Sequence, residues 1–415
     1  MRKIILLFIL LLVTSNGFAL TLQQAIEVAL KQSPDVLIQR HKEVEAKEQK
    51  RAKIATSYGK ISAVGSYTYY NLPRTLAPIT PPIKPDIVTS KGIYSLGLKY
   101  SLPLFKGFQD VIAINISSLE KNIAQIKYNL TKAQLIFNIK SLFYKILSLK
   151  DQLRTLETYR NALNVLYNNT QLEVRVGRKA SIDLLKIKSD LEEVDFNIVN
   201  IKNSINSLKS ALAFTIGVDR VKKVEDVDIK QDMDFNFKIK DTYKYKLAKA
   251  ELYKANQNVL KSKTLYLPRI NFSVYYGNNY AREEKKELWQ VGLTCDWLLF
   301  DFGAREAEIA KANSLKMSAL LRLEKTAMEI KNLIVDIQNK IKTERERIRS
   351  LKSQLVFLQK VRKVEEIKYK NGVSNMYDLL LSIAKEKQAQ NSLVEAKYNL
   401  NIHQAYLEYI VKGAK

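Results

Sequence analysis

The sequence predicts a mainly α-helical protein with a small β part, built from a helix-helix-strand-strand-long helix-helix unit that occurs twice. Three observations predict this fold. Residues 108–176 and 304–371 contain no Gly or Pro, and such stretches permit very long helices because Gly and Pro are the strong helix breakers. The phrase GRKASIDLL at Gly177 returns 195 residues later as GVSNMYDLL at Gly372. Four short stretches between the helices alternate apolar and polar residues.

Residues 1–19 predict a secretory signal peptide. Arg2 and Lys3 form a positive start, residues 4–13 are apolar, and Gly17-Phe18-Ala19 supplies the small residues that a signal peptidase reads. Ten apolar residues are too few to span a membrane as a mature helix. The mature chain is therefore expected to begin near Leu20 and to work outside the cytoplasm.

The balance of charge is strongly basic, with a formal net charge of +26 over 415 residues. Such a charge suggests nucleic acid, an anionic membrane surface or acidic ligands as partners. The alternative is that Lys and Arg line the solvated faces of long helices, since they are spread along the chain among acidic residues. Secretion excludes nucleic acid from the expected partners.

The chain offers few residues for catalysis or metal binding. It has one cysteine, Cys295, and two histidines, His41 and His403, which lie in unrelated stretches. This spacing matches no metal site and no nucleophilic constellation. No enzyme activity, cofactor or metal is therefore expected.

The two long helical stretches carry a coiled-coil pattern. Apolar residues from Leu119 to Phe137, from Leu142 to Leu156 and from Ile348 to Leu358 recur in steps of three and four. A repeat near 3.5 residues places a narrow apolar seam against a neighbouring helix. Helices of this length would reach roughly 100 Å. A filamentous coil without a lumen is an alternative that this pattern alone allows.

The alternating stretches predict strands at about 60–70, 93–103, 268–277 and 288–298. Each has one apolar face with aromatic residues at its ends and one face of small polar residues, which is typical of outer-membrane barrels. A soluble β-sandwich would show the same alternation. The connections within each strand pair are rich in proline or in charge, so they are expected to face water.

The number of strands indicates an oligomer if the strands lie in a membrane. Four strands cannot close, and each unpaired backbone group at an open edge in lipid would cost several kcal/mol. Bacterial barrels begin at about eight strands, and a barrel of that size is filled by its own side chains. Three chains would supply twelve strands and a lumen wide enough for passage.

The order, spacing and duplication of these elements resemble the TolC-like outer membrane efflux protein (outer membrane factor) family over the whole mature chain. The matching stretches are LTLQQAIEVALKQSPDVLIQ at 20–39, LPLFKGF at 102–108 and WLLFDFGAR at 297–305. The resemblance implies a homotrimer with a twelve-stranded β-barrel in outer-membrane lipid and a helical tunnel, an α-barrel, in the periplasm. It implies repeats at 20–217 and 241–415, joined by an equatorial linker at 218–240.

The resemblance also implies a function. Such a chain is the passive export duct of a tripartite efflux or type I secretion system, from the periplasm to the exterior. Its partners would be a periplasmic adaptor (membrane fusion protein) and an inner-membrane transporter, which supplies the energy. The alternative interpretation is a periplasmic coiled-coil adaptor or an envelope scaffold protein, although neither would explain the aromatic strand pairs.

The duplicated phrases lie at the ends of the long helices away from the strands, where glycine permits a tight reversal. The resemblance implies that these tips dock the adaptor and close the resting pore. Asp183 and Asp378 match the family's tip aspartates, and three copies would form a carboxylate ring that favours cations. The alternative is that each aspartate only stabilises the first turn of a helix.

Further tip residues follow from the same resemblance. Tyr369 matches a tyrosine of the family's closing latch. Ser374 and Leu381 depart from the family's arginine and second aspartate, while Arg178 and Lys179 lie near the arginine's place in the first repeat, so the latch is expected to be rewired. The leucines of the tips are either hairpin core or adaptor contacts. The residues assigned to adaptor docking are Gly177, Arg178, Leu184, Leu185, Gly372, Leu379 and Leu380.

Overall fold

The computed structural model describes residues 20–79, 81–82, 87–225, 238–281 and 284–411. The expected signal peptide at 1–19 lies outside the described residues, as do residues 226–237 of the expected linker. The chain divides into two compact units, which are described separately. The first comprises Met1–Ile38, Asn129–Thr242 and Glu329–Lys415, and the second comprises Gln39–Tyr128 and Tyr243–Met328.

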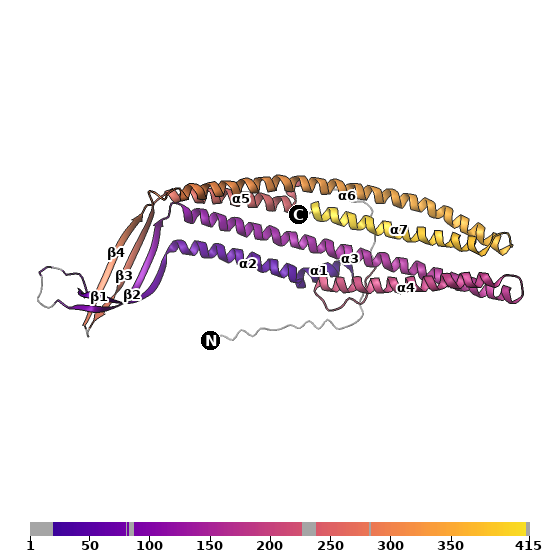
Figure 1. The fold of residues 1–415 in the computed structure, drawn as a ribbon, viewed down its shortest axis with the longest axis horizontal. Helices are drawn as coiled ribbons and strands as arrows, with labels where there is room; N and C mark the ends of the chain where they lie inside the picture. Colours follow the sequence, from indigo (N-terminus) through magenta and orange to yellow (C-terminus); the bar gives the residue numbers. More distant parts are fainter. Residues whose placement is uncertain (1–19, 80, 83–86, 226–237, 282–283, 412–415) are drawn as a thin grey trace. The chain divides into compact units, whose positions relative to one another are not determined.

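The four longest helices repeat with one fixed offset. Helices α3 (Gln109–Arg175) and α6 (Ala304–Lys370) have 67 residues each, and α4 (Ser181–Ile216) and α7 (Met376–Val411) have 36 each. Both ends of α6 and α7 fall 195 residues after the matching ends of α3 and α4. In the first unit α3 and α4 run side by side, as do α6 and α7 (Figure 1). The two hairpins are thus structural copies.

Three shorter helices complete the helical part: α1 (Leu22–Gln32), α2 (Pro34–Ala55) and α5 (Tyr243–Lys263). Thr21 and Gln24 form a capping box that starts α1, and Pro34 occupies the first position of α2, where its missing N–H is not needed. Short 3-10 turns lie at Thr56–Tyr58, Ile239–Asp241 and Thr264–Tyr266. In the described part of the chain, no helix has the length and apolarity needed to cross a membrane.

The core of the first unit lies between its two helical hairpins. Side chains of α3, α4, α6 and α7 meet there. Ile187 and Met376, one from each hairpin, are fully buried. The buried members of this cluster are Tyr159, Leu163, Ile187, Val194, Ile198, Tyr369, Met376, Leu379 and Leu380.

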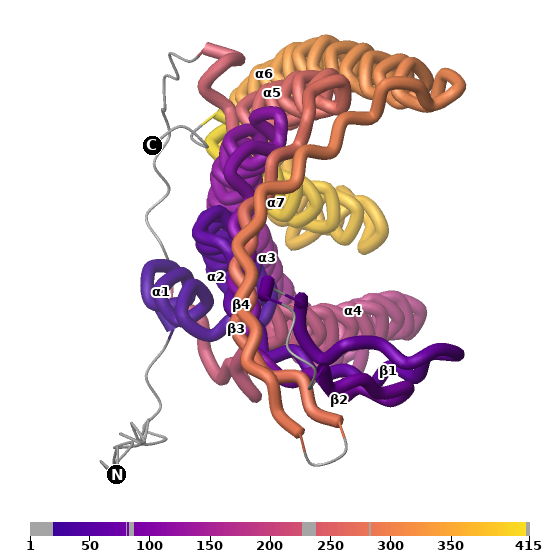
Figure 2. Tube along the Cα trace, turned by 90° about the vertical axis from the view of Figure 1, so that its left-hand side faces the viewer, coloured from indigo at the N-terminus to yellow at the C-terminus, as the bar shows by residue number. Residues whose placement is uncertain are grey.

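The second unit contains one antiparallel sheet in the order β1-β2-β3-β4. Its strands are β1 (Lys60–Thr75), β2 (Thr89–Phe105), β3 (Arg269–Ala281) and β4 (Glu284–Asp296), and Figure 2 shows β3 and β4 side by side. All four strands extend further toward their connections than the alternation predicted. β2 pairs with β3, so strands from the two repeats form a single sheet whose edges are β1 and β4.

The register separates the sheet into two faces. Leu98 of β2 lies opposite Tyr276 of β3, which lies opposite Trp289 of β4. These side chains are 56, 52 and 69 % exposed, so no described residue of the chain covers this part of the apolar face. The opposite face carries mainly Ser, Asn, Thr, Gly and Lys. An apolar outer face and a polar inner face are what a barrel in lipid requires.

The turns from strand to long helix are also repeated. Gly107 and Phe108 have φ values of +62° and +63°, and Phe302 and Gly303 have φ values of +55° and +90°. The order of glycine and phenylalanine is reversed between the repeats, yet both positions are left-handed in each. A phenylalanine in this region is strained. The strand and the long helix that each turn connects therefore impose the left-handed conformation on the turn.

An ion pair stabilises each of these two turns, and the positive and negative residues exchange places between the repeats. Lys106 Nζ lies 3.2 Å from Asp110 Oδ1 in the first turn, and Arg305 Nε lies 2.9 Å from Asp301 Oδ2 in the second. Arg305 is buried and also donates to two backbone carbonyl oxygens of the turn. Trp297, expected in the fourth strand, lies just after β4, because the chain already turns there toward α6.

Candidate functional site at the hairpin tips

Both tips end their long helix with the same hydrogen-bonded turn. Gly177 and Gly372 adopt φ values of +72° and +74°. The N–H of the residue after each glycine donates five residues back, at 2.8 Å from Arg178 and 2.9 Å from Val373. Each glycine's own N–H donates three residues back, at 3.0 and 3.2 Å. This is the Schellman arrangement, in which glycine has no steric penalty.

Asp378 lies exposed in the first turn of α7. Its backbone N–H donates to Asn375 Oδ1 at 2.9 Å, so Asn375 caps the helix. Ser374 Oγ lies 2.9 Å from Glu365 Oε2 and 3.5 Å from Asp378 Oδ2. A hydrogen bond and the charge of Glu365, with a smaller contribution from Asp378, raise the pKa of Lys368. The serine therefore lies between two carboxylates, at the position where the resemblance implied an arginine.

Asp183 occupies the equivalent place in the first turn of α4 but has different neighbours. The residue in the position of Asn375 is Ala180, which forms no side-chain cap. Asp183 is half-buried, and no side-chain hydrogen bond or ion pair of its carboxylate is found within the described chain. Its charge can act on the free N–H groups of the helix start and on an ion near the tip.

Lys179 joins the two hairpins of one chain. Its ammonium nitrogen lies 3.3 Å from the centroid of the Tyr369 ring and 2.8 Å from Glu173 Oε2. Burial opposes the charged form, but Glu173 and Tyr369 outweigh it and raise the pKa of Lys179. Tyr369 itself is only 6 % exposed. The sequence predicted a rewired latch near this place, and that role stays a prediction; the structure shows a cation–π contact between the two hairpins there.

The tip leucines differ in burial between the repeats. Leu379 and Leu380 are 2 and 7 % exposed and belong to the core between the hairpins. Their burial favours the hairpin-core alternative, and their docking role stays a prediction. Leu184 is half-buried, whereas Leu185 is 63 % exposed. Arg178 is also exposed.

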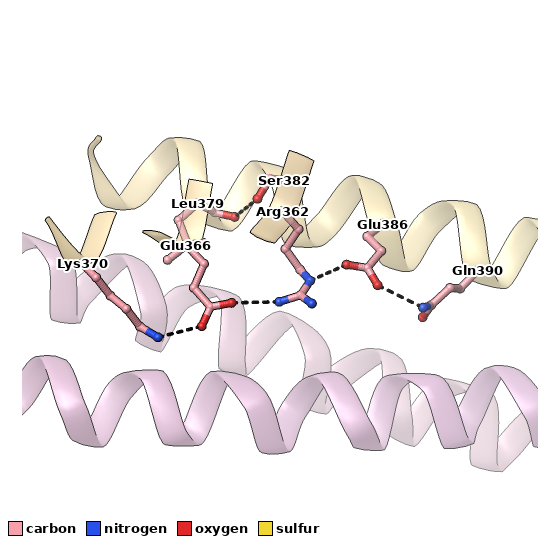
Figure 3. A network of polar contacts seen from close by, with 7 residues as sticks. All are labelled: Arg362, Glu366, Lys370, Leu379, Ser382, Glu386 and Gln390. Carbon is pink, nitrogen blue, oxygen red and sulfur yellow. Dashed lines mark hydrogen bonds and ion pairs between the residues drawn. The ribbon is translucent and has the colours of Figure 1, made fainter. Parts of the chain in front are cut away.

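A polar network holds α6 against α7 behind the second tip (Figure 3). Arg362 Nε donates to Glu386 Oε2 at 2.6 Å, and Arg362 Nη1 donates to Glu366 Oε2 at 3.0 Å. Lys370 and Gln390 complete the network through Glu366 and Glu386, at 3.0 and 3.2 Å. The Glu386 side chain is only 7 % exposed, so its charge depends on these donors.

A cavity of about 450 Å³ lies between α3, α4 and α7. Burial and the neighbouring Glu193 raise the pKa of Asp190. Burial and the charges of Asp190 and Glu193 raise the pKa of Tyr159 to about 12. Burial is the main cause that lowers the pKa of Lys387, against the opposing charge of Glu386. The space between the hairpins is therefore polar, and its carboxylates and lysine lie at partly desolvated positions.

Sequence reasoning did not find the roles of Arg362 and Glu386. The signal was available in the repeat, because Glu386 occupies the place of Leu191 and Arg362 that of Tyr167. Charges at two apolar seam positions of a repeat indicate a paired network. Within the described residues, no group of three or more His, Cys, Asp or Glu side chains could hold a metal ion.

Each chain has four amphipathic strands with an exposed apolar face, and one long helical hairpin follows each strand pair. This combination is typical of an outer-membrane channel with a helical extension. Residues 25–218 and 246–411 match the family model of the outer membrane efflux proteins. The chain belongs to this family, and the resemblance found in its sequence is confirmed. No curated protein matches the sequence.

Solved structures of similar fold agree with this assignment. The outer membrane protein VceC of Vibrio cholerae has 16 % identity and a TM-score of 0.80 over 94 % of this chain and 95 % of its own. The CmeC outer membrane channel of Campylobacter jejuni has 15 % identity and a TM-score of 0.81, over 95 and 86 %. The open-state MtrE outer membrane channel of Neisseria gonorrhoeae has 16 % identity and a TM-score of 0.77, over 95 and 89 %.

The expected fold class, localisation and general function are therefore confirmed. The protein is an outer-membrane efflux channel whose helical part extends into the periplasm. Its family is one of channels rather than enzymes. Neither the periplasmic adaptor nor the envelope scaffold is supported by the comparisons.

Proposed function

We propose that three copies of this chain form the passive outer-membrane duct of a tripartite efflux or type I secretion system. The observation that carries the proposal is the sheet with two open edges and an uncovered apolar face. Three sheets joined through β1 and β4 would close a barrel, pair all edge groups and turn the apolar faces to lipid. The helices below would follow the same threefold axis as a tunnel.

The partners would be a periplasmic adaptor and an inner-membrane transporter. The tips present exposed apolar side chains to such a partner: Val176, Leu185, Val373 and Tyr377 are 67, 63, 77 and 61 % exposed. Exposed apolar groups surrounded by a polar rim are typical of a docking surface. The chain would perform no catalysis, and the transporter would supply the energy.

Asp183 and Asp378 would line the pore entrance. Tyr369 would hold the two tips of one chain together through its contact with Lys179. Six carboxylates from three chains would raise the local concentration of cations in a narrow mouth. The helix-start role of each aspartate is compatible with this, because the same charge faces both the free N–H groups and the mouth.

The test is the current through the reconstituted trimer in a lipid bilayer. We expect heat-labile, SDS-resistant trimers that conduct, with a current that La³⁺ blocks from the side of the tips. The paired substitution Asp183→Asn with Asp378→Asn should weaken this block at least about tenfold, since six charges are lost from the mouth.

Asp35→Asn is the matched control, because Asp35 is an exposed aspartate in the first turn of α2. It removes an equivalent helix-start charge away from the tips and should leave the block unchanged. Equal block in all variants would leave the two tip aspartates with a helix-start role only. A chain that stays monomeric and never conducts would contradict the proposed function itself.

Lys179→Gln should open the tips. The substitution removes the ammonium group from the Tyr369 ring and from Glu173, and a partly desolvated cation–π contact is worth about 1–2 kcal/mol. We expect the open probability of the resting channel to rise about tenfold. Arg178→Gln is the neighbouring control, since the exposed Arg178 side chain has no ion pair in the described chain. A resting current that responds equally to both substitutions would assign no latch function to Lys179.

A further inference from the structure

The polar face of the sheet carries charges that are mostly matched in pairs. Along the continuously paired strands, Arg269 of β3 lies directly opposite Asp296 of β4. Lys286 Nζ lies 4.0 Å from Glu284 Oε2. Each pair brings one positive and one negative group together, so these four residues add no net charge to the face.

Two lysines in the continuously paired part of β1 and β2 lie on the same face and have no such match. The register places Lys60 of β1 opposite Ser101 of β2, and Lys99 of β2 opposite Ser62 of β1. Both lysines are exposed, and neither has an ion pair or a side-chain hydrogen bond within the described residues. The strand neighbours between them are small hydroxyl side chains, which neither neutralise nor cover an ammonium group.

The two lysines are close enough to act as one charge centre. They are diagonal neighbours on adjacent antiparallel strands, a relation that places the two residues about 7–8 Å apart, with their Cβ atoms somewhat closer. The Debye length is about 10 Å at 0.1 M ionic strength. Their fields therefore overlap at ordinary salt. Lys60 begins β1, so the pair lies at the end of the sheet from which the chain leaves for the helices.

We propose that Lys60 and Lys99 form an anion-selecting ring inside the barrel, a proposal that rests on the proposed trimer. The apolar face must turn to lipid, so the face with the lysines lines the lumen. Three copies place six ammonium groups at one level of a water-filled passage. A ring of one sign attracts counter-ions and repels ions of its own sign. The barrel therefore favours anionic solutes, in contrast to the cation-favouring aspartates of the tips.

Inorganic tripolyphosphate, added to the compartment that faces the barrel, tests the ring. We expect it to block the open current of the wild-type trimer in a lipid bilayer. The variant that combines Lys60→Gln with Lys99→Gln should require at least about fivefold more tripolyphosphate for half block, because it loses six charges. The variant with arginine at both positions keeps the charge and should be blocked like the wild type.

Lys285→Gln is the matched control. Lys285 is an exposed lysine of the same sheet that lies opposite Tyr280, on the lipid-facing side. It should leave the block unchanged. The lysine ring would be overturned if tripolyphosphate did not affect the wild-type current, or if it blocked the Lys→Gln variant equally well. Either result would leave the proposed channel function intact. A chain without any conductance would instead contradict the proposed trimeric duct.

Discussion

Gly277→Ala is expected to prevent assembly of the membrane sheet. A Cβ atom at Gly277 would lie 2.5 Å from the Leu96 carbonyl oxygen and 2.7 Å from the Gly97 Cα atom. These are backbone atoms of the neighbouring strand, so the clash cannot be relieved by turning a side chain. Overpacking of this kind costs about 1–3 kcal/mol per site, and the trimer would contain three such sites. The fraction of heat-labile, SDS-resistant trimer in the outer membrane should fall more than about tenfold.

Another glycine of the same sheet supplies the control for this substitution. Gly292 of β4 lies on the same polar face, opposite Ser273, and a Cβ atom there would meet only Ser273 Oγ at 3.8 Å. Gly292→Ala should therefore assemble like the wild type, because alanine also loses less chain entropy than glycine. If Gly277→Ala assembled as well as Gly292→Ala, the close contact between β2 and β3 would not be required.

These glycines show what the sequence could and could not predict about the sheet. Gly97 and Gly292 are repeat equivalents, 195 residues apart, and both fit the alternation that predicted strands. The structure gives them different roles, because Gly97 lies opposite Gly277 at the contact between β2 and β3. Alternation reports which face a residue occupies. It does not report which strand of the other repeat lies beside it.

The helices were predictable for a local reason. The helices begin and end where Gly, Pro and the tip turns occur, and a few neighbouring residues determine each of these features. The packing of the tips was less predictable. Leu185 and Leu380 are repeat equivalents, yet one is 63 % exposed and the other 7 %. The two hairpins of one chain pack against each other, so equivalent positions meet different partners, and repeat symmetry cannot decide their burial.

Arg362→Ala is expected to loosen the second hairpin behind its tip. The Glu386 carboxylate would keep only Gln390 as a donor in the network while remaining buried. Breaking a buried ion pair costs about 3–5 kcal/mol, and about 3 kcal/mol is the value expected because the Arg362 side chain is 36 % exposed. Hydrogen exchange of the α6 and α7 amides near the tip should become about a hundredfold faster, since these amides exchange through local opening.

Arg349→Ala on the same helix is the matched control. Its pair with Glu346 spans 3.9 Å, and the two side chains are 84 and 67 % exposed, so removing it should change exchange by less than about twofold. Equal exchange in both variants would mean that the buried Glu386 does not depend on Arg362.

The first repeat predicts how the loss of Arg362 could be repaired. Its residues at the two equivalent positions are Tyr167 and Leu191, which pack against the core between the hairpins. Replacing both charges by these residues, Arg362→Tyr with Glu386→Leu, leaves no buried charge to satisfy, and well-packed apolar pairs often equal or exceed the buried ion pairs that they replace. The double variant should therefore recover most of the protection that Arg362→Ala loses. Exchange as fast as in the single variant would show that the network also positions α6 on α7 through its geometry, and that apolar packing cannot replace it.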